Sequence, residues 1–230
     1  MILERWFGLE AKRKRLLKRV PPGALRDYLS VPFPSPKQGL HETRLLCLDF
    51  ETTGLHPQFD KILSVGYCPM QRGQISLRGR YHRIVKIEGA LKDANVAVHK
   101  ITEQDKARGA ALAEVVESLL AALCGRVMLV HYAQIERSFL QRACSELYGV
   151  TPVFPMIDTI VLAKRRLDKS LVAYDPSQLR LPALRAEHKL APHFEHNALN
   201  DAVATGELLL AELSAQQIEP EVRLEQLLLR

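Results

Sequence analysis

The stretch from Arg44 to Gly54, RLLCLDFETTG, decides how this chain folds and where its chemistry lies. Apolar residues occupy both faces of residues 44–50, which predicts a buried central strand. Asp49 and Glu51 stand at its end, and a side-chain period of two points both carboxylates to one face of the sheet. Like charges this close repel, and Mg²⁺ or Mn²⁺, which prefer oxygen ligands, would remove that cost. The alternative, surface ion pairs beyond the strand end, is less favoured because carboxylates on an apolar strand need a compensating partner.

A second polar cluster, HNALND, runs from His196 to Asp201. Five residues at about 100° each do not bring these two side chains onto one helical face. We therefore expect Asn197 to be the N-cap of a helix, with His196 on the preceding loop and Asp201 in the second turn. A fixed carboxylate beside a movable imidazole suits a metal ligand and a general base. The alternative is that the histidine has a capping or packing role.

Hydrophobic periodicity predicts an α/β domain with a mixed sheet, because three strands are followed by alternating helices and strands. Thr102 and Asp105 resemble an N-terminal capping pair, which predicts the start of a helix after the first three strands. The expected strands are residues 44–50, 61–69, 74–82, 126–131 and 156–159, and the expected helices are residues 109–124, 134–147 and 197–213.

The two ends of the chain differ in composition from this domain, which we place at residues 41–214. Residues 1–20 hold seven basic residues and two acidic ones, Glu4 and Glu10, so this arm carries +5 of the formal +6. A proline-rich lead follows up to residue 40, and residues 215–230 are expected to form a helical tail. The basic arm suits a polyanion such as nucleic acid. A solvated helix or a membrane-surface helix remains an equal alternative.

The cysteines and the hydropathy pattern bear on the cellular compartment. Cys47, Cys68, Cys124 and Cys144 lie far apart and form no C-x-x-C pair, so we expect buried, reduced thiols rather than a zinc or redox site. There is no apolar run long enough for a membrane span and no signal-peptide pattern. These features predict a cytoplasmic enzyme with no membrane association.

The two polar clusters together resemble the motifs of the DEDDh family of 3′→5′ exonucleases, which includes the proofreading epsilon subunit of bacterial DNA polymerase III. The family motif D-x-E-T-T-G is present as Asp49 to Gly54, and H-x-x-x-x-D is present as His196 to Asp201. Ala202 and Thr205 continue the usual neighbourhood of the second of these motifs. The resemblance runs from about residue 44 to residue 213.

This resemblance implies an RNase H-like fold, with a five-stranded mixed sheet flanked by helices. It implies that Asp49, Glu51 and Asp201 hold two divalent ions, Mg²⁺ or Mn²⁺, with Asp49 bridging them. His196 would take the proton from the attacking water. In the general two-metal scheme, one ion generates the nucleophile and the other stabilises the leaving oxygen.

The resemblance also assigns substrate-binding residues. Thr52, Thr53 and Gly54 would line the pocket for the terminal nucleotide, and Gly54 would let backbone approach the substrate closely. His99 matches a family segment near the substrate, although a packing role is an equal alternative for it.

The chain departs from the family at a third motif, usually H-N-x-x-F-D, where it has HYAQIE from His131 to Glu136. The expected aspartate is Glu136, whose side chain is one methylene longer. Family members generally use this carboxylate through water, so the change puts the rate and the metal preference in question more than the reaction. A surface glutamate paired with Arg137 is the alternative interpretation.

The sequence therefore predicts an exonuclease that releases nucleoside 5′-monophosphates from the 3′ end of DNA, in proofreading or repair, with a polymerase or repair protein as a possible partner. An exoribonuclease is a second hypothesis. A third is a catalytically weakened module that binds nucleic-acid ends or a polymerase.

Overall fold

The computed structural model describes residues 2–87, 101–169, 173–219 and 221–229, and these form a mixed α/β fold around one sheet. The strand order is β3-β2-β1-β5-β6, with β4 also paired to β2. β1 pairs antiparallel with β2 and parallel with β5, so it is central, as predicted. The strands are β1 Leu45–Thr52, β2 Ile62–Gln71, β3 Gln74–Ile75, β4 Tyr81–Ile84, β5 Val127–Val130 and β6 Met156–Asp158.

The sheet has six strands where we predicted five, because the expected strand at 74–82 is divided. Its two halves both pair with β2 but are separated by a 3₁₀ turn, Leu77–Gly79. Pro69 on β2 lies opposite this turn and has no N–H to donate, so the ladder cannot continue past it. A Cβ atom on Gly79 would lie 2.8 Å from the Pro69 ring, which is why a glycine fits there.

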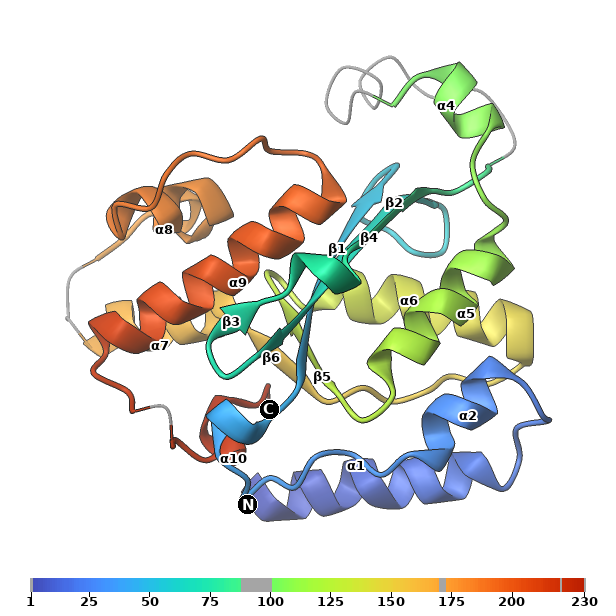
Figure 1. The fold of residues 1–230 in the computed structure, drawn as a ribbon, viewed down its shortest axis with the longest axis horizontal. Helices are drawn as coiled ribbons and strands as arrows, with labels where there is room; N and C mark the ends of the chain where they lie inside the picture. The colour runs from blue at the N-terminus through green and yellow to red at the C-terminus, as the bar shows by residue number, and fades with distance from the viewer. Residues whose placement is uncertain (1, 88–100, 170–172, 220, 230) are drawn as a thin grey trace.

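Helices cover both faces of the sheet. α7, α8 and α9 lie on one side and α5 and α6 on the other, while α1 and α2 run along the end of the domain where β1 begins (Figure 1). The helices are α1 Ile2–Leu17, α2 Ala24–Ser30, α4 Glu103–Ala107, α5 Leu112–Leu123, α6 Gln134–Tyr148, α7 Thr159–Lys169, α8 Leu181–Glu187, α9 Ala198–Ala215 and α10 Leu224–Leu227. Among them, none is long and apolar enough to cross a bilayer.

Two helix starts follow the predicted capping. Thr102 and Asp105 form a full capping box at α4, and Asn197 caps α9 by accepting the backbone N–H of Asn200. The helix predicted from residue 109 begins instead at Leu112. Gly109 lies too close to the end of β4 for a side chain, since a Cβ there would meet the Lys86 nitrogen at 2.6 Å.

Both terminal segments contribute buried residues to the core. Leu25, Tyr28 and Leu29 of α2 pack into the same apolar cluster as the sheet, together with Leu224 of the C-terminal segment. Backbone bridges join Gly39 to Arg223 and Ile157 to Leu228. The basic arm is thus packed as a helix, and the domain limits at residues 40 and 214 stay a prediction.

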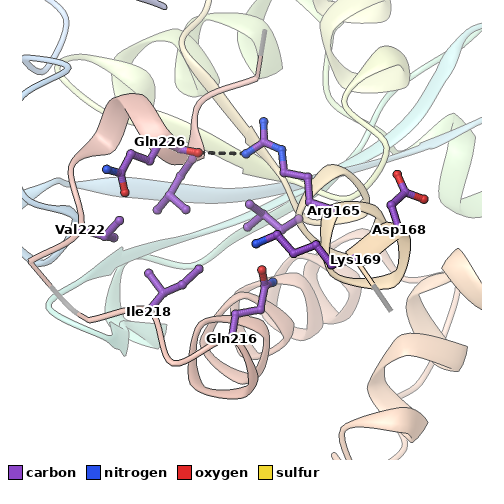
Figure 2. Close-up of a pocket in the computed structure, with 9 residues that line it drawn as sticks. Arg165, Asp168, Lys169, Gln216, Ile218, Val222 and Gln226 are labelled. Carbon is purple, nitrogen blue, oxygen red and sulfur yellow. Dashed lines mark hydrogen bonds between the residues drawn. The ribbon is translucent and has the colours of Figure 1, made fainter. Parts of the chain in front are cut away.

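Among residues 216–219 and 221–229, which the structure describes, the C-terminal tail is helical only over the four residues of α10, so the prediction of a helical tail at 215–230 is wrong for most of these residues. It packs across the end of α7, where Arg165 Nη1 donates to the Gln226 carbonyl at 2.9 Å (Figure 2). A hollow of about 480 Å³ lies beneath it, with Ile218 and Val222 on its wall. Tertiary contacts with α7 and the sheet replace helical hydrogen bonds in this segment.

The thiols of all four cysteines are free, as predicted. Cys47, Cys68 and Cys144 are buried, whereas Cys124 is only half-buried at the end of α5, which corrects the expectation for that residue.

Candidate active site

Three carboxylates meet at one face of the sheet, where β1 ends and α9 begins. Asp49 and Glu51 come from β1 and Asp201 from the first turn of α9. Each offers one oxygen, and these oxygens all lie within 4.8 Å of one another. Glu51 and Asp201 are only 6% and 8% exposed. The structure therefore brings together the residues that the two sequence clusters singled out.

Gly66 allows α9 to reach this position. It pairs with Asp49 across β1 and β2, and a Cβ added there would lie 2.1 Å from the backbone of Ala198 and Leu199. The N-terminus of α9 thus rests on bare backbone of the sheet. This contact sets Asp201 beside Asp49, and the backbone N–H of Asn197 holds Asp201 Oδ2 at 3.1 Å.

Burial and mutual repulsion dominate the electrostatics. Burial raises the pKa of Asp49 well above its usual range, and the charges of Glu136, Glu51 and Asp201 raise it further. Burial and the charge of Glu51 likewise raise the pKa of Asp201. A set of hard oxygen donors whose like charges repel one another fits a divalent cation such as Mg²⁺ or Mn²⁺.

Glu136 sits in the first turn of α6 and is 2% exposed, so it is not a surface residue paired with solvent-facing charges. Burial raises its pKa well above the ordinary value, and the charges of Asp158 and Glu51 add to this, against hydrogen bonding from the backbone of Phe50. Its Oε2 has no hydrogen-bond partner among the described residues. Glu136 stands outside the tight trio of carboxylates but is electrostatically linked to it.

Asp158, at the end of β6, is a buried carboxylate that the sequence reasoning missed. It accepts the backbone N–H groups of Tyr132, Ala133 and Ile160 at 3.1, 2.9 and 2.9 Å. It therefore fixes the start of α6, the helix that carries Glu136. The available signal was its place at the end of a strand parallel to β5, since such strand ends meet at one edge of a sheet.

The backbone explains one feature of the third motif. Tyr132 has a φ of 74°, a left-handed conformation that costs least for glycine or asparagine. The asparagine of the family pattern suits this position better than the tyrosine found here. His131 beside it is structural: burial lowers its pKa to about 4, and its Nδ1 lies 2.7 Å from Thr159 Oγ1.

Two histidines lie on the loop before α9, and they differ in their contacts. His196 is exposed and has a φ of 62°, so it occupies the predicted loop position. His193, which the sequence reasoning did not single out, has its Nε2 2.8 Å from Asp201 Oδ1. In this structure His193 rather than His196 makes that contact with the carboxylate.

The loop after β1 is organised around Asp60. Thr53 Oγ1 donates to Asp60 Oδ1 at 3.1 Å, and Thr52 Oγ1 donates to the Gly54 carbonyl at 2.7 Å. A Cβ on Gly54 would lie 2.5 Å from Asp60 Oδ2, so the absence of a side chain lets this carboxylate close the loop. His99, the other predicted substrate residue, lies outside the described residues.

A comparison with known protein families places this arrangement. The family model RNase_T, described as Exonuclease, matches residues 46–209. The chain belongs to this exonuclease family. Its sheet and helices have the RNase H-like arrangement of that family.

The curated relatives of this chain are much longer proteins. The chain is 31% identical over 204 residues to the DNA polymerase III PolC-type of Thermotoga petrophila, which covers 89% of this chain and 14% of that protein. It is 30% identical over 180 residues to a DNA polymerase III subunit epsilon-like protein of Rhodobacter capsulatus, covering 76% and 24%. The chain thus spans about a seventh of the length of the first relative and about a quarter of the length of the second.

Solved structures share the fold at lower identity. The nuclease domain of 3′hExo, a DEDDh family member bound to rAMP, matches with a TM-score of 0.66 and 17% identity, covering 83% of this chain and 98% of that one. Exonuclease X in complex with 5′ overhanging duplex DNA matches with a TM-score of 0.59 and 20% identity, covering 80% and 98%.

Proposed function

We propose that the chain is a metal-dependent 3′→5′ exonuclease that hydrolyses the terminal phosphodiester of DNA to nucleoside 5′-monophosphates. The observation that carries the proposal is the trio Asp49, Glu51 and Asp201, whose oxygens converge within 4.8 Å. Burial and the charges of Glu136, Glu51 and Asp201 all raise the pKa of Asp49, so these carboxylates repel one another. Such a cluster stores like charge that a divalent cation would neutralise.

Asp49, Glu51 and Asp201 would hold two ions, Mg²⁺ or Mn²⁺. Bound ions of this kind supply a nucleophile at neutral pH and stabilise the charge on the leaving 3′-oxygen. The protein's own residues would then orient the strand end and move the proton. Thr52, Thr53 and Gly54 would form the wall of the terminal-nucleotide pocket, held in shape by Asp60.

His196 would accept the proton of the attacking water at a ring nitrogen. Its exposed loop position beside the buried Asp201 supports this role, because a base must reach the reacting water and then release its proton to solvent. His193 would hold Asp201 before the substrate arrives, since its Nε2 lies 2.8 Å from the carboxylate.

DNA is the favoured substrate because the curated relatives carry DNA polymerase names. An exoribonuclease is kept as the second candidate, because one solved neighbour is described as bound to rAMP. A polymerase or repair protein is the proposed partner. A module that binds ends without cutting them is less favoured, because all four carboxylates are present. Asp49, Glu51 and Asp201 form the trio, and the charge of Glu136 raises the pKa of Asp49.

The experiment is a time course on matched DNA and RNA oligonucleotides, labelled separately at the 5′ and 3′ ends, with Mg²⁺, Mn²⁺ or chelator. We expect stepwise shortening of the 5′-labelled DNA, loss in chelator and loss in Asp49→Ala. Glu146→Gln, at an exposed ion pair with Arg142, is the control that should cut normally. Full activity in chelator would refute the metal requirement, and binding without cutting would favour the end-binding module.

A further inference from the structure

The stretch of chain that forms β2, β3 and β4 is rich in positive charge. From Lys61 to Ile87 the sequence has no aspartate or glutamate. The same stretch holds six basic residues: Lys61, Arg72, Arg78, Arg80, Arg83 and Lys86. The basic arm at residues 1–20 is also positively charged, but it lies far from the carboxylates, because α1 is at the opposite end of β1 (Figure 1).

Three of these arginines gather around one hollow at β4. It measures about 460 Å³ and is lined by Arg78, Arg80, Tyr81, His82, Arg83 and Leu199. Arg78, Arg80 and Arg83 are exposed, and no described carboxylate lies within ion-pair distance of them. An arginine cluster without acidic partners keeps its donors available for an anion, and guanidinium groups bind phosphate in a bidentate manner.

The hollow is next to the active site through the register of the sheet. His82 on β4 pairs with Gly66 on β2, and Gly66 pairs with Asp49 on β1. Paired residues share a face, so His82 and Asp49 lie on the same side, about 10 Å apart over two strand spacings. Arg83 is one residue further along β4 and lies on the other face, but it also lines the hollow at this edge. Leu199 joins them, because the start of α9 rests on Gly66 and also forms part of the hollow.

Local contacts order the arginines without neutralising them. Arg80 Nη1 donates to the Leu77 carbonyl at 3.0 Å, and Arg83 Nη1 donates to the His82 carbonyl at 3.0 Å. The Arg83 guanidinium also lies over the Tyr81 ring, 5.4 Å from its centroid, and Tyr81 stacks on Tyr67 at 4.7 Å. Side chains held in place in this way lose less entropy when they bind.

We propose that Arg78, Arg80 and Arg83 form a phosphate track that binds the backbone of the nucleic-acid strand whose 3′ end occupies the carboxylate site. This proposal rests on the proposed exonuclease function. The ligand is the phosphodiester backbone, so recognition is independent of base sequence. The carboxylates repel an incoming polyanion, and the track supplies the opposite charge one or two nucleotides away.

The test compares two triple variants that lose the same charge. One is Arg78→Gln with Arg80→Gln and Arg83→Gln. The control is Lys37→Gln with Lys164→Gln and Arg180→Gln, three exposed positions outside the hollow. Binding of a fluorescent single-stranded DNA hexamer is measured by anisotropy from 25 to 300 mM NaCl, with Asp49→Asn in every protein to prevent cutting. Thermal unfolding confirms that each variant is folded.

We expect the track variant to bind at least tenfold more weakly at low salt. Its plot of log affinity against log salt should be shallower by about 2, since each single-strand phosphate contact contributes about 0.7. The control should keep the slope of the parent. Equal affinity and slope in the two variants would overturn the track.

A second measurement separates this outcome from failure of the proposed function. With active proteins, hydrolysis of the DNA hexamer is compared with that of thymidine 5′-monophosphate p-nitrophenyl ester, which is too short to reach the hollow. The track variant should lose at least tenfold more kcat/KM on the hexamer than on the ester. Equal losses would mean that the arginines support the fold of the site. If the parent hydrolyses neither substrate, the exonuclease proposal fails, while the anisotropy result still tests the track.

Discussion

α9 carries two buried carboxylates whose surroundings are opposite. At its C-terminal end, Glu212 is fully buried and receives hydrogen bonds from Arg166 and Gln216 at 3.0 Å, with His188 Nε2 also at 3.0 Å. At its N-terminal end, Asp201 faces Glu51 and Asp49. Burial acts to raise both pKa values. Arg166 and His188 reverse that effect for Glu212, whose pKa is lowered, whereas the pKa of Asp201 stays raised.

The difference separates a structural carboxylate from a functional one. Glu212 ties α9 to α7 through Arg166 and to the end of α8 through His188, so its charge is used within the protein. Asp201 contacts His193 and the Asn197 N–H, but burial and the charge of Glu51 still keep its pKa raised, so a bound cation would stabilise it further. The five predictions that follow test this distinction, from the largest expected effect to the smallest.

Replacing Asp49 of the carboxylate trio and Glu212 at the C-terminal end of α9 should have opposite effects on activity and stability. Asp49→Asn should lower kcat on DNA about 10³-fold or more, because it removes several kcal/mol of transition-state stabilisation. It should also raise the melting temperature in chelator, since it relieves repulsion. Glu212→Gln should retain activity per folded molecule and lose about 2–3 kcal/mol of stability, because Arg166 loses a buried partner. Destabilisation by Asp49→Asn in chelator would contradict the distinction.

The two histidines near Asp201 should separate in kinetics. His196→Ala should reduce kcat by about 10²–10⁴-fold and leave substrate binding intact, as expected for a general base. The wild-type rate should rise with pH, and the variant should lose that rise. If His193→Ala instead shows the larger loss and the flat profile, the role of base belongs to His193.

Variants of Glu136 test whether the active site includes a fourth carboxylate beyond the trio. Glu136→Gln should reduce the rate about 10²-fold, because a misplaced group near the reaction costs about that much. Glu136→Asp should stay within about tenfold of the wild type. The rates are to be compared in Mg²⁺ and Mn²⁺, with a relative preference for Mn²⁺ expected because it tolerates looser coordination. A wild-type rate for Glu136→Gln in both metals would remove Glu136 from the site.

The pH dependence of stability should distinguish Asp49 and Asp201 of the trio from Glu212 at the C-terminal end of α9. The pKa values of Asp49 and Asp201 are raised, so the folded metal-free protein retains protons that the unfolded chain releases above about pH 4. Its stability should therefore fall as pH rises from about 4 through the raised values. The pKa of Glu212 is lowered, so its contribution is present above about pH 4.5 and is lost as pH falls through the lowered value.

Urea denaturation in chelator at pH 5 and pH 8 measures this. The wild type should be less stable at pH 8, and Asp201→Asn should lose less stability between the two values. Glu212→Gln should be weaker at both but keep the wild-type difference. A wild-type protein equally stable at both pH values would show that the carboxylates are not repelling one another.

The smallest effect should come from α1, whose exposed charges lie far from the carboxylates (Figure 1). Changing Lys14, Arg15 and Lys18 to glutamine should weaken binding of a long duplex by a fewfold and flatten its salt dependence. It should leave a hexamer unaffected, because α1 lies beyond the start of a β1 that is about 26 Å long. Deleting residues 1–20 is a poorer test, since it removes the buried Arg13 and Val20. Unchanged duplex binding would favour a protein or membrane contact for the arm.

Local patterns in the sequence predicted the elements that bring the site together. The spacing of Asp49 and Glu51 on an apolar strand and the cap at Asn197 both carried over into the structure. The residues that were missed act over long separations. Asp158 holds α6 from 26 residues away, and no local pattern marks that contact. His193 contacts Asp201 from an irregular loop, where periodicity carries no information.

The sequence predicted the helices and strands better than it predicted where positive charges gather in the folded protein. Composition drew attention to the N-terminal arm because its basic residues are consecutive. The arginines at and just before β4 are separated along the chain, and only the pairing of β4 with β2 brings this segment near β1. The sixth strand was missed for the same reason, because it depends on how the strands pair. Pro69 interrupts the hydrogen-bond ladder only when a neighbouring strand is paired with β2.

The seat of α9 on Gly66 has a consequence for how this protein would be studied by mutagenesis. An alanine scan detects residues by taking atoms away, and here the requirement is that a side chain be missing. Such a scan would normally skip the glycine, and a scan of α9 would attribute the position of Asp201 to its own packing residues. The geometry of the carboxylates depends instead on two main chains in direct contact, which leaves no rotamer to adjust when the spacing changes.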